Sequence, residues 1–224
     1  MKQRIKYVKL NVVKSALSRE GVWMGRGLLI AIEGIDGSGK TTNASELFSY
    51  LKNLGYPVLL LKEPSDSIYG QKIRSSEKRL PVEEELKLFL LDREIDVRER
   101  IVPALEEGKI VIMDRYYYSN IAYQSARGIE AEKIRELNER FAPKPDLVII
   151  LDVSPEIALE RIKVRGKKTA FEEKEYLERV RESFLKIADE RTIVVNAERP
   201  LEEVREEIFY AVRRLLNSYD PRRG

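Results

Sequence analysis

The chain has 224 residues, of which 43% are hydrophobic and 35% charged, a composition typical of one folded domain with a sizeable core. Cysteine and histidine are both absent, which excludes disulfides, thiolate zinc sites, cysteine nucleophiles and any reaction that needs imidazole as a base. The net charge of +3 is concentrated in residues 1–24, which carry +5, so the other 200 residues carry about −2. We therefore expect no nucleic-acid surface on the folded part.

Three segments are distinguished by charge and pattern: a basic N-terminal extension at 1–24, a folded domain at 25–217 and a C-terminal tail at 218–224. No apolar run is near the roughly 20 residues that a membrane helix needs, and the N-terminus lacks a continuous apolar segment of the signal-peptide type. We therefore expect a cytoplasmic protein without a membrane partner.

The apolar run 28–32 predicts a buried strand, and residues 34–41 directly after it match the phosphate-loop pattern G-x-x-x-x-G-K-[ST]. In such a loop the backbone N–H groups turn toward phosphate oxygens, and the following helix adds its positive end. Lys40 adds a mobile charge, and Thr41 offers a hydroxyl to Mg²⁺. The residues expected to bind a nucleoside triphosphate are Gly34, Ile35, Asp36, Gly37, Ser38, Gly39, Lys40, Thr41 and Thr42.

Apolar residues at helical spacing follow the loop as far as Gly55, and further apolar runs at 58–61, 110–113, 147–153 and 193–195 predict strands. Helical patterns lie between these runs at 82–107, where Pro103 is expected to kink or divide the helix, and from Pro155 onward with Ser154 as its cap. A further helical pattern at 201–217 closes the chain. This alternation predicts an α/β fold, a parallel five-stranded sheet with helices on both faces.

Asp114 and Arg115 directly follow the run 110–113, at the sheet edge where ligands of such folds bind. Asp114 is expected to hold Mg²⁺ through its waters, and Arg115 to grip an acceptor phosphate. A surface Asp–Arg pair is the alternative. Asp152 is a rival acid, but its place at a helix entry favours a structural role.

Several motifs in one order resemble those of thymidylate kinases: GIDGSGKTT at 34–42, Glu63-Pro64, FLLDR at 89–93, DRYYYSN at 114–120, AYQ at 122–124, and Phe171-Glu172. The resemblance covers nearly all of residues 27–216. It implies the P-loop nucleoside monophosphate kinase fold and a homodimer, with ATP and Mg²⁺ as cofactors. The implied reaction is MgATP plus dTMP giving ADP and dTDP.

The resemblance also implies residue roles. Asp36 would accept a hydrogen bond from the 3′-hydroxyl of the acceptor. Phe89 would stack on the pyrimidine, and Arg93, on the same helix face, would reach the base or phosphate; an ordinary core role for Phe89 is the alternative. Asn120, with Gln124 as second candidate, would read the Watson–Crick edge of thymine. Tyr123 would pack near the 2′ carbon of the deoxyribose and so disfavour ribonucleotides.

Gly37 stands where human-like thymidylate kinases carry an arginine, so this chain resembles the class that supplies cations from a lid. The expected lid lies at about 161–173 and contains Arg161, Lys163, Arg165, Lys167 and Lys168, with Gly166 as a candidate hinge. The expected catalytic set is Lys40, Asp36, Arg115 and Arg165. Two departures stand out: Thr169-Ala170 replace an Asp-Arg pair of the lid, and Ser65-Asp66-Ser67 replace Gly-Gly-Thr.

Two other functions are compatible with a phosphate loop. One is a different nucleoside monophosphate or deoxynucleoside kinase, although Arg93 and Arg115 together favour an acceptor that already bears phosphate. The other is a non-catalytic P-loop regulator, in which the nucleotide controls contacts with a partner. An assay of activity with different acceptors distinguishes a thymidylate kinase from the first alternative. The effect of Lys40→Ala and Arg115→Ala on turnover distinguishes an enzyme from the second.

Overall fold

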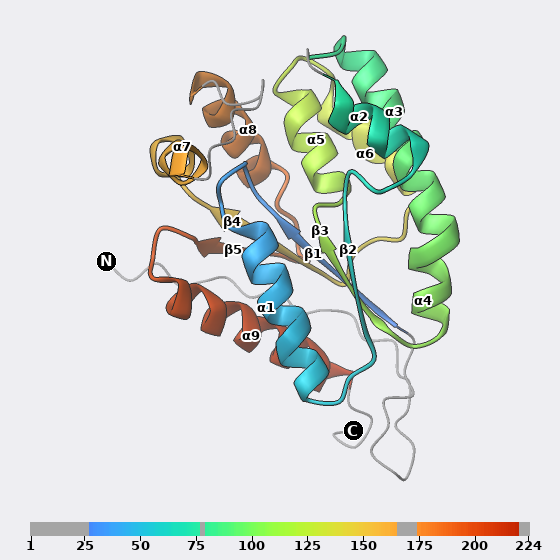
Figure 1. Cartoon of the computed structure of the whole chain (residues 1–224), viewed down its shortest axis with the longest axis vertical. Coiled ribbons are helices and arrows are strands. Elements are labelled where there is room, and N and C mark those ends of the chain that lie inside the picture. Colours follow the sequence, from blue (N-terminus) through green and yellow to red (C-terminus); the bar gives the residue numbers. More distant parts are fainter. Residues whose placement is uncertain (1–26, 77–78, 165–173, 220–224) are drawn as a thin grey trace.

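A computed structural model describes residues 27–76, 79–164 and 174–219 (Figure 1). Five parallel strands form one sheet in the order β2-β3-β1-β4-β5, which confirms the predicted α/β fold. The strands are β1 (Leu28–Glu33), β2 (Val58–Lys62), β3 (Ile110–Asp114), β4 (Leu147–Asp152) and β5 (Thr192–Asn196). The proposed N-terminal extension, lid residues 165–173 and residues 220–224 lie outside the described part.

Burial explains why the central strands read as continuous apolar runs. Every residue of β1 and β3 is buried, because neighbouring strands flank each one and helices cover the sheet. The edge strands β2 and β5 are only partly buried. In the register, Asp114 pairs with Ile32 on one side and Lys62 on the other, so the carboxyl ends of β1, β2 and β3 meet.

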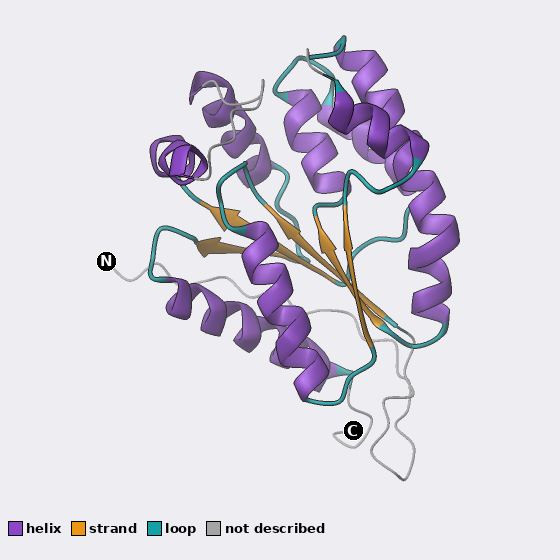
Figure 2. Cartoon of the chain, in the orientation of Figure 1, coloured by secondary structure: helices purple, strands orange, loops and turns teal. Residues whose placement is uncertain are grey.

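Helices α1 and α9 pack together on one side of the sheet, and the long helix formed by α3, η1 and α4 lies on the other (Figures 1 and 2). The helices are α1 (Lys40–Asn53), α2 (Ile68–Ser75), α3 (Val82–Asp96), η1 (Val97–Ile101), α4 (Val102–Glu106), α5 (Tyr117–Ser125), α6 (Ala131–Glu139), α7 (Pro155–Val164), α8 (Lys174–Lys186) and α9 (Leu201–Ser218). Among the described helices, none combines the length and apolarity needed to cross a membrane.

The predicted effect of Pro103 takes the form of a π-helical turn. Proline has no N–H to donate to the carbonyl one turn earlier, and its ring crowds that carbonyl. The helix widens in η1 directly before the proline, and the N–H of Val102 donates to the carbonyl of Val97, five residues back. The helix therefore continues through the proline with a local change of pitch.

Candidate active site

The phosphate loop connects β1 to α1 as predicted. Gly34, Gly37 and Gly39 have φ values of 138°, 83° and 95°, a region that favours glycine. A Cβ on residue 37 would lie 2.4 Å from the carbonyl oxygen of Ala158 on α7, so no larger side chain fits there without moving that helix. The loop of this chain therefore has no room for the arginine of human-like thymidylate kinases.

The N-terminus of α1 presents its backbone N–H groups to the loop, because none of the described side chains caps it. Lys40 is buried and its Nζ donates to the carbonyl oxygen of Ile35 at 2.7 Å, with the hydroxyl of Ser38 3.4 Å away. Burial, together with the charge of Arg115, lowers the pKa of Lys40 to about 7. The loop thus combines open N–H donors with an ammonium group that a phosphate would stabilise.

The two residues predicted to hold the metal are in direct contact. The Thr41 hydroxyl donates to Asp114 Oδ2 at 2.6 Å. The other carboxylate oxygen, Asp114 Oδ1, is buried and has no hydrogen-bond partner among the residues that the structure describes. A buried carboxylate oxygen beside a hydroxyl is the type of oxygen pair that Mg²⁺ accepts, completed by phosphate and water. The donor set therefore fits the expected ion.

Asp36 of the loop forms a cluster with Arg115 and Tyr123. Its carboxylate is ion-paired with Arg115 Nη2, and its backbone N–H donates to the Tyr123 hydroxyl at 3.0 Å. Burial opposes the ionisation of Asp36, but Arg115 and Lys40 together hold its pKa below the usual range. The predicted catalytic and acceptor-binding residues of this cluster therefore meet at the loop, and the carboxylate is ionised.

Arg115 has φ of 73°, an uncommon backbone conformation for a residue with a side chain. Glu33 at the end of β1 stabilises the turn that follows it. The fully buried Glu33 carboxylate accepts hydrogen bonds from the N–H groups of Tyr116 and Ser119 at 2.8 and 3.2 Å and from the Ser119 hydroxyl at 2.6 Å. Since α5 begins at Tyr117, the Glu33 side chain at the end of β1 caps the N-terminus of this helix.

Glu33 has no assigned role in the sequence prediction. Burial raises its pKa to about 7, although Ser119 and Arg115 act in the opposite direction. A glutamate at the end of an otherwise apolar buried strand is the signal that marks it, because such a carboxylate needs hydrogen-bond partners.

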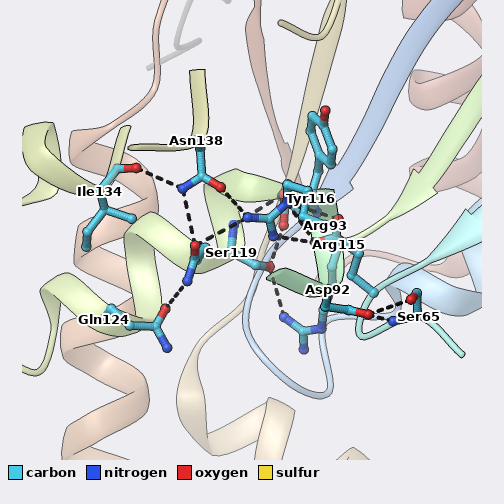
Figure 3. Close-up of polar contacts among 12 residues, drawn as sticks. Ser65, Asp92, Arg93, Arg115, Tyr116, Ser119, Gln124, Ile134 and Asn138 are labelled. Carbon is cyan, nitrogen blue, oxygen red and sulfur yellow. Dashed lines mark hydrogen bonds and ion pairs between the residues drawn. The ribbon is translucent and has the colours of Figure 1, made fainter. Parts of the chain in front are cut away.

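Arg93 lies in a buried polar network rather than at an open surface (Figure 3). Its Nε donates to both carboxylate oxygens of Glu63 at 3.0 and 3.1 Å, and its Nη2 also binds that carboxylate. Its Nη1 donates to the side-chain oxygens of Asn120, at 3.3 Å, and Asn138. These contacts use four of the five N–H donors of a guanidinium group, leaving one on Nη2.

The same network continues through the candidate base-reading residues. Asn120 donates to Gln124 at 2.7 Å, and Gln124 donates to Glu85 at 2.8 Å. Phe89 is half-buried, one turn from Arg93 on α3. The structure thus connects Arg93, Asn120 and Gln124 through hydrogen bonds.

Asn138 of α6 is a residue that the sequence prediction does not include. It is fully buried, and its Nδ2 donates to Asn120 Oδ1 at 3.2 Å and to the carbonyl of Ile134 at 2.8 Å (Figure 3). The only signal for it is an asparagine four residues after Ile134, on the face of α6 that is otherwise apolar.

The Ser-Asp-Ser segment that replaces Gly-Gly-Thr is anchored by Asp92 of α3. The Asp92 carboxylate accepts from the N–H of Ser65 at 2.8 Å, from the Ser65 hydroxyl at 2.5 Å and from the Ser67 hydroxyl at 2.6 Å. Ser67 in turn caps α2 by accepting from Tyr69 and Gly70. The departure therefore replaces flexible glycines with a loop fixed by a buried carboxylate.

The remaining predictions concern Asp152, which lies just before α7, and the expected lid. Asp152 accepts two hydrogen bonds from Arg181, at 2.6 and 2.8 Å, which supports its structural interpretation. Arg161 at the base of the expected lid donates to the carbonyl of Ala197 at 2.9 Å. Arg165, the candidate catalytic cation of the lid, lies outside the described residues.

Comparison with known proteins identifies one family. The profile of the family described as thymidylate kinase matches residues 32–208. A probable thymidylate kinase of Archaeoglobus fulgidus is 62% identical over 190 residues, which cover 85% of this chain and 97% of that protein. A probable thymidylate kinase of Pyrococcus horikoshii is 43% identical over 202 residues, covering 85% and 98%, and a thymidylate kinase of Akkermansia muciniphila is 44% identical over 181 residues, covering 80% and 88%.

Proposed function

Because the chain belongs to the thymidylate kinase family, we propose that it transfers the γ-phosphoryl group of ATP to dTMP, giving ADP and dTDP. The observation that carries the proposal is the contact of Asp36 with Arg115 and Tyr123. It joins the loop that binds a triphosphate to an arginine suited to a second phosphate. A phosphorylated acceptor beside the γ-phosphate is what a nucleoside monophosphate kinase requires.

In this reaction an oxygen of the dTMP phosphate attacks the γ-phosphorus, and the bond to the β–γ bridging oxygen breaks, so that ADP leaves. The attacking phosphate oxygen is already ionised, hence no general base is needed and the absence of histidine is no obstacle. Lys40 and the loop N–H groups would bind the donor phosphates. Arg115 would exchange Asp36 for the acceptor phosphate, and Asp36 would then accept from the 3′-hydroxyl.

We propose that Thr41 and Asp114 hold Mg²⁺, which would neutralise charge on the donor phosphates. The support is the buried Oδ1 of Asp114, which has no hydrogen-bond partner within the described part of the chain and lies beside the Thr41 hydroxyl. Arg165 would supply the further cation, since the packing of Gly37 against α7 leaves no space for one in the loop. A fall of about 100-fold in kcat for Arg165→Ala, with Lys163→Ala close to wild type, is the expected result. Equal effects of the two substitutions would contradict the assignment.

For the acceptor, we propose that Phe89 stacks on thymine and that Asn120, with Gln124, reads its edge. Arg93 would contribute through its remaining Nη2 proton while Glu63 fixes its orientation. Tyr123 would pack against the deoxyribose, near C2′. The oligomeric state, for which the family implies a homodimer, is tested by sedimentation velocity.

The deciding experiment is a coupled ADP-release assay with dTMP, dUMP, dCMP, UMP and AMP as acceptors. We expect the highest kcat/KM for dTMP, because the proposed contacts read a methylated pyrimidine on a deoxyribose. Higher kcat/KM for a ribonucleotide would overturn the acceptor assignment. ATP binding without ADP release for any acceptor would instead favour the regulator.

A further inference from the structure

Lys62 occupies an unexpected position beside the two candidate metal ligands. It ends β2 and pairs in register with Asp114 at the end of β3, so their side chains leave the sheet together. Its Nζ lies 3.2 Å from Asp114 Oδ2 and 3.1 Å from Thr41 Oγ1. A positive charge of the protein therefore contacts both oxygen groups proposed for Mg²⁺.

The partners of this ion pair differ in burial. The Asp114 side chain is 4% exposed, whereas that of Lys62 is 58% exposed. Breaking such a pair from the exposed side costs little, since the lysine regains water, whereas the buried carboxylate needs another cation. The carboxylate is thus the fixed member and the ammonium group the exchangeable one.

Space for the exchange is present next to Lys62. A cavity of about 430 Å³ is lined by Thr41, Lys62 and Asp114 together with Leu60, Pro64 and Arg100. Arg100 is already paired with Asp96. The flexible lysine stem can therefore turn into this cavity without displacing another side chain.

We propose that Lys62 is a built-in counter-ion that neutralises Asp114 in the metal-free protein and competes with Mg²⁺ for it. The inference rests on the proposed function only in taking Thr41 and Asp114 as the metal pair. Lys62 contacts Oδ2 of the carboxylate whose other oxygen, Oδ1, has no partner among the described residues and is open to Mg²⁺, and it also contacts Thr41 Oγ1. Because Mg²⁺ ligands lie about 2.1 Å from the ion, the bound ion and the ammonium group would lie close together and repel each other strongly. Lys62 consequently weakens metal binding while keeping the two ligands together.

Calorimetric titration with ADP tests this, once with Mg²⁺ and once with EDTA, without dTMP or turnover. The ratio of the Kd in EDTA to the Kd in Mg²⁺ measures the contribution of the metal. Because free ADP is more negative than MgADP, loss of a lysine can also raise the Kd in EDTA, so the competition requires that the ratio rise through a lower Kd in Mg²⁺. We expect Lys62→Met to raise this ratio about fivefold, the upper range for a partly exposed ion pair. Lys62→Arg, which keeps the charge, should stay near the wild-type ratio.

Lys72→Met is the matched control, since the Lys72 side chain is 57% exposed and its Nζ lies 3.5 Å from Glu84. Its ratio should equal that of the wild type. A change of less than twofold for Lys62→Met, or a lower ratio, would overturn the competition. Asp114→Asn tests the proposed metal ligands separately from the role of Lys62. A ratio close to one in this variant supports Thr41 and Asp114 as the metal pair, whatever the result for Lys62→Met. An unchanged ratio rejects the metal pair and the competition with it.

Discussion

Glu33 and Tyr116 are 83 residues apart in the chain, and the Glu33 carboxylate accepts the Tyr116 N–H at 2.8 Å directly after the left-handed turn at Arg115. The buried end of β1 thereby fixes the turn that aims Arg115 at the phosphate loop. Because burial raises the pKa of Glu33, the free energy of unfolding should depend on pH.

Glu33→Gln should remove a cost in folding free energy that grows as the pH rises. Burial raises the pKa of Glu33 from 4.5 to about 7, so between these values the native state binds more protons than the unfolded chain. Wild-type stability from this group therefore falls as the pH rises through that window, by about 3 kcal/mol in total. Urea unfolding at pH 5 and pH 8 should show the variant gaining relative to the wild type at the higher pH.

Glu46→Gln removes a more exposed carboxylate on α1 and serves as the control, with the wild-type pH dependence expected. A difference between Glu33→Gln and wild type that stays constant from pH 5 to pH 8 would mean that Glu33 does not titrate in this range.

Arg115→Gly should separate the charge of this residue from its backbone. Loss of the ion pair with Asp36 should lower the free energy of unfolding, but glycine adopts φ of 73° without the steric cost of a side chain and so offsets part of this loss. The lost guanidinium should lower kcat/KM for dTMP by about 10²–10³-fold, as when preorganised charge is removed. Urea unfolding and the coupled assay provide the two measurements. Arg115→Ala, with the same loss of charge, should be the less stable of the two, and near-wild-type kcat/KM in either variant would exclude the proposed phosphate contact.

The strands were predictable from sequence because buried parallel strands are continuous apolar runs. Each observed strand begins and ends within one residue of the predicted run. Helix α5 was not predicted, since Tyr117 to Gln124 are all buried, polar residues included, and such a helix has no solvent-exposed face that would give a hydrophobic period. The phosphate-loop residues and the pairing of Thr41 with Asp114 were predictable, because they lie where the strands end at one edge of the sheet. The ion pair between Arg93 and Glu63 was not predictable, because it depends on how α3 packs against that edge of the sheet.

Asn138→Leu should weaken dTMP binding more than catalysis. The asparagine holds Arg93 and Asn120 together, and leucine of similar size leaves buried donors and acceptors of both residues without this partner, at a cost of about 1–3 kcal/mol in stability. We expect KM for dTMP to rise about tenfold with kcat within threefold of wild type, which corresponds to about 1.4 kcal/mol of binding. Steady-state kinetics with dTMP as the varied substrate measures both.

A purely structural role of Asn138 would lower stability without this change in KM. Asn53→Leu makes the same substitution at the exposed end of α1, where neither KM nor kcat for dTMP should change.

Binding of ADP without metal should draw a proton onto Lys40. Burial and the neighbouring Arg115 hold its pKa at about 7, so at pH 8 most of the ligand-free protein has a neutral amine. Bound phosphates favour the ammonium form and raise this pKa, whereas the phosphate of ADP, with a second pKa near 6, is already ionised. Calorimetry at pH 8 in two buffers of different ionisation enthalpy should therefore report uptake of about one proton. Lys40→Met should bind ADP more weakly and take up none, and if its uptake matched that of the wild type, the proton would have to bind elsewhere.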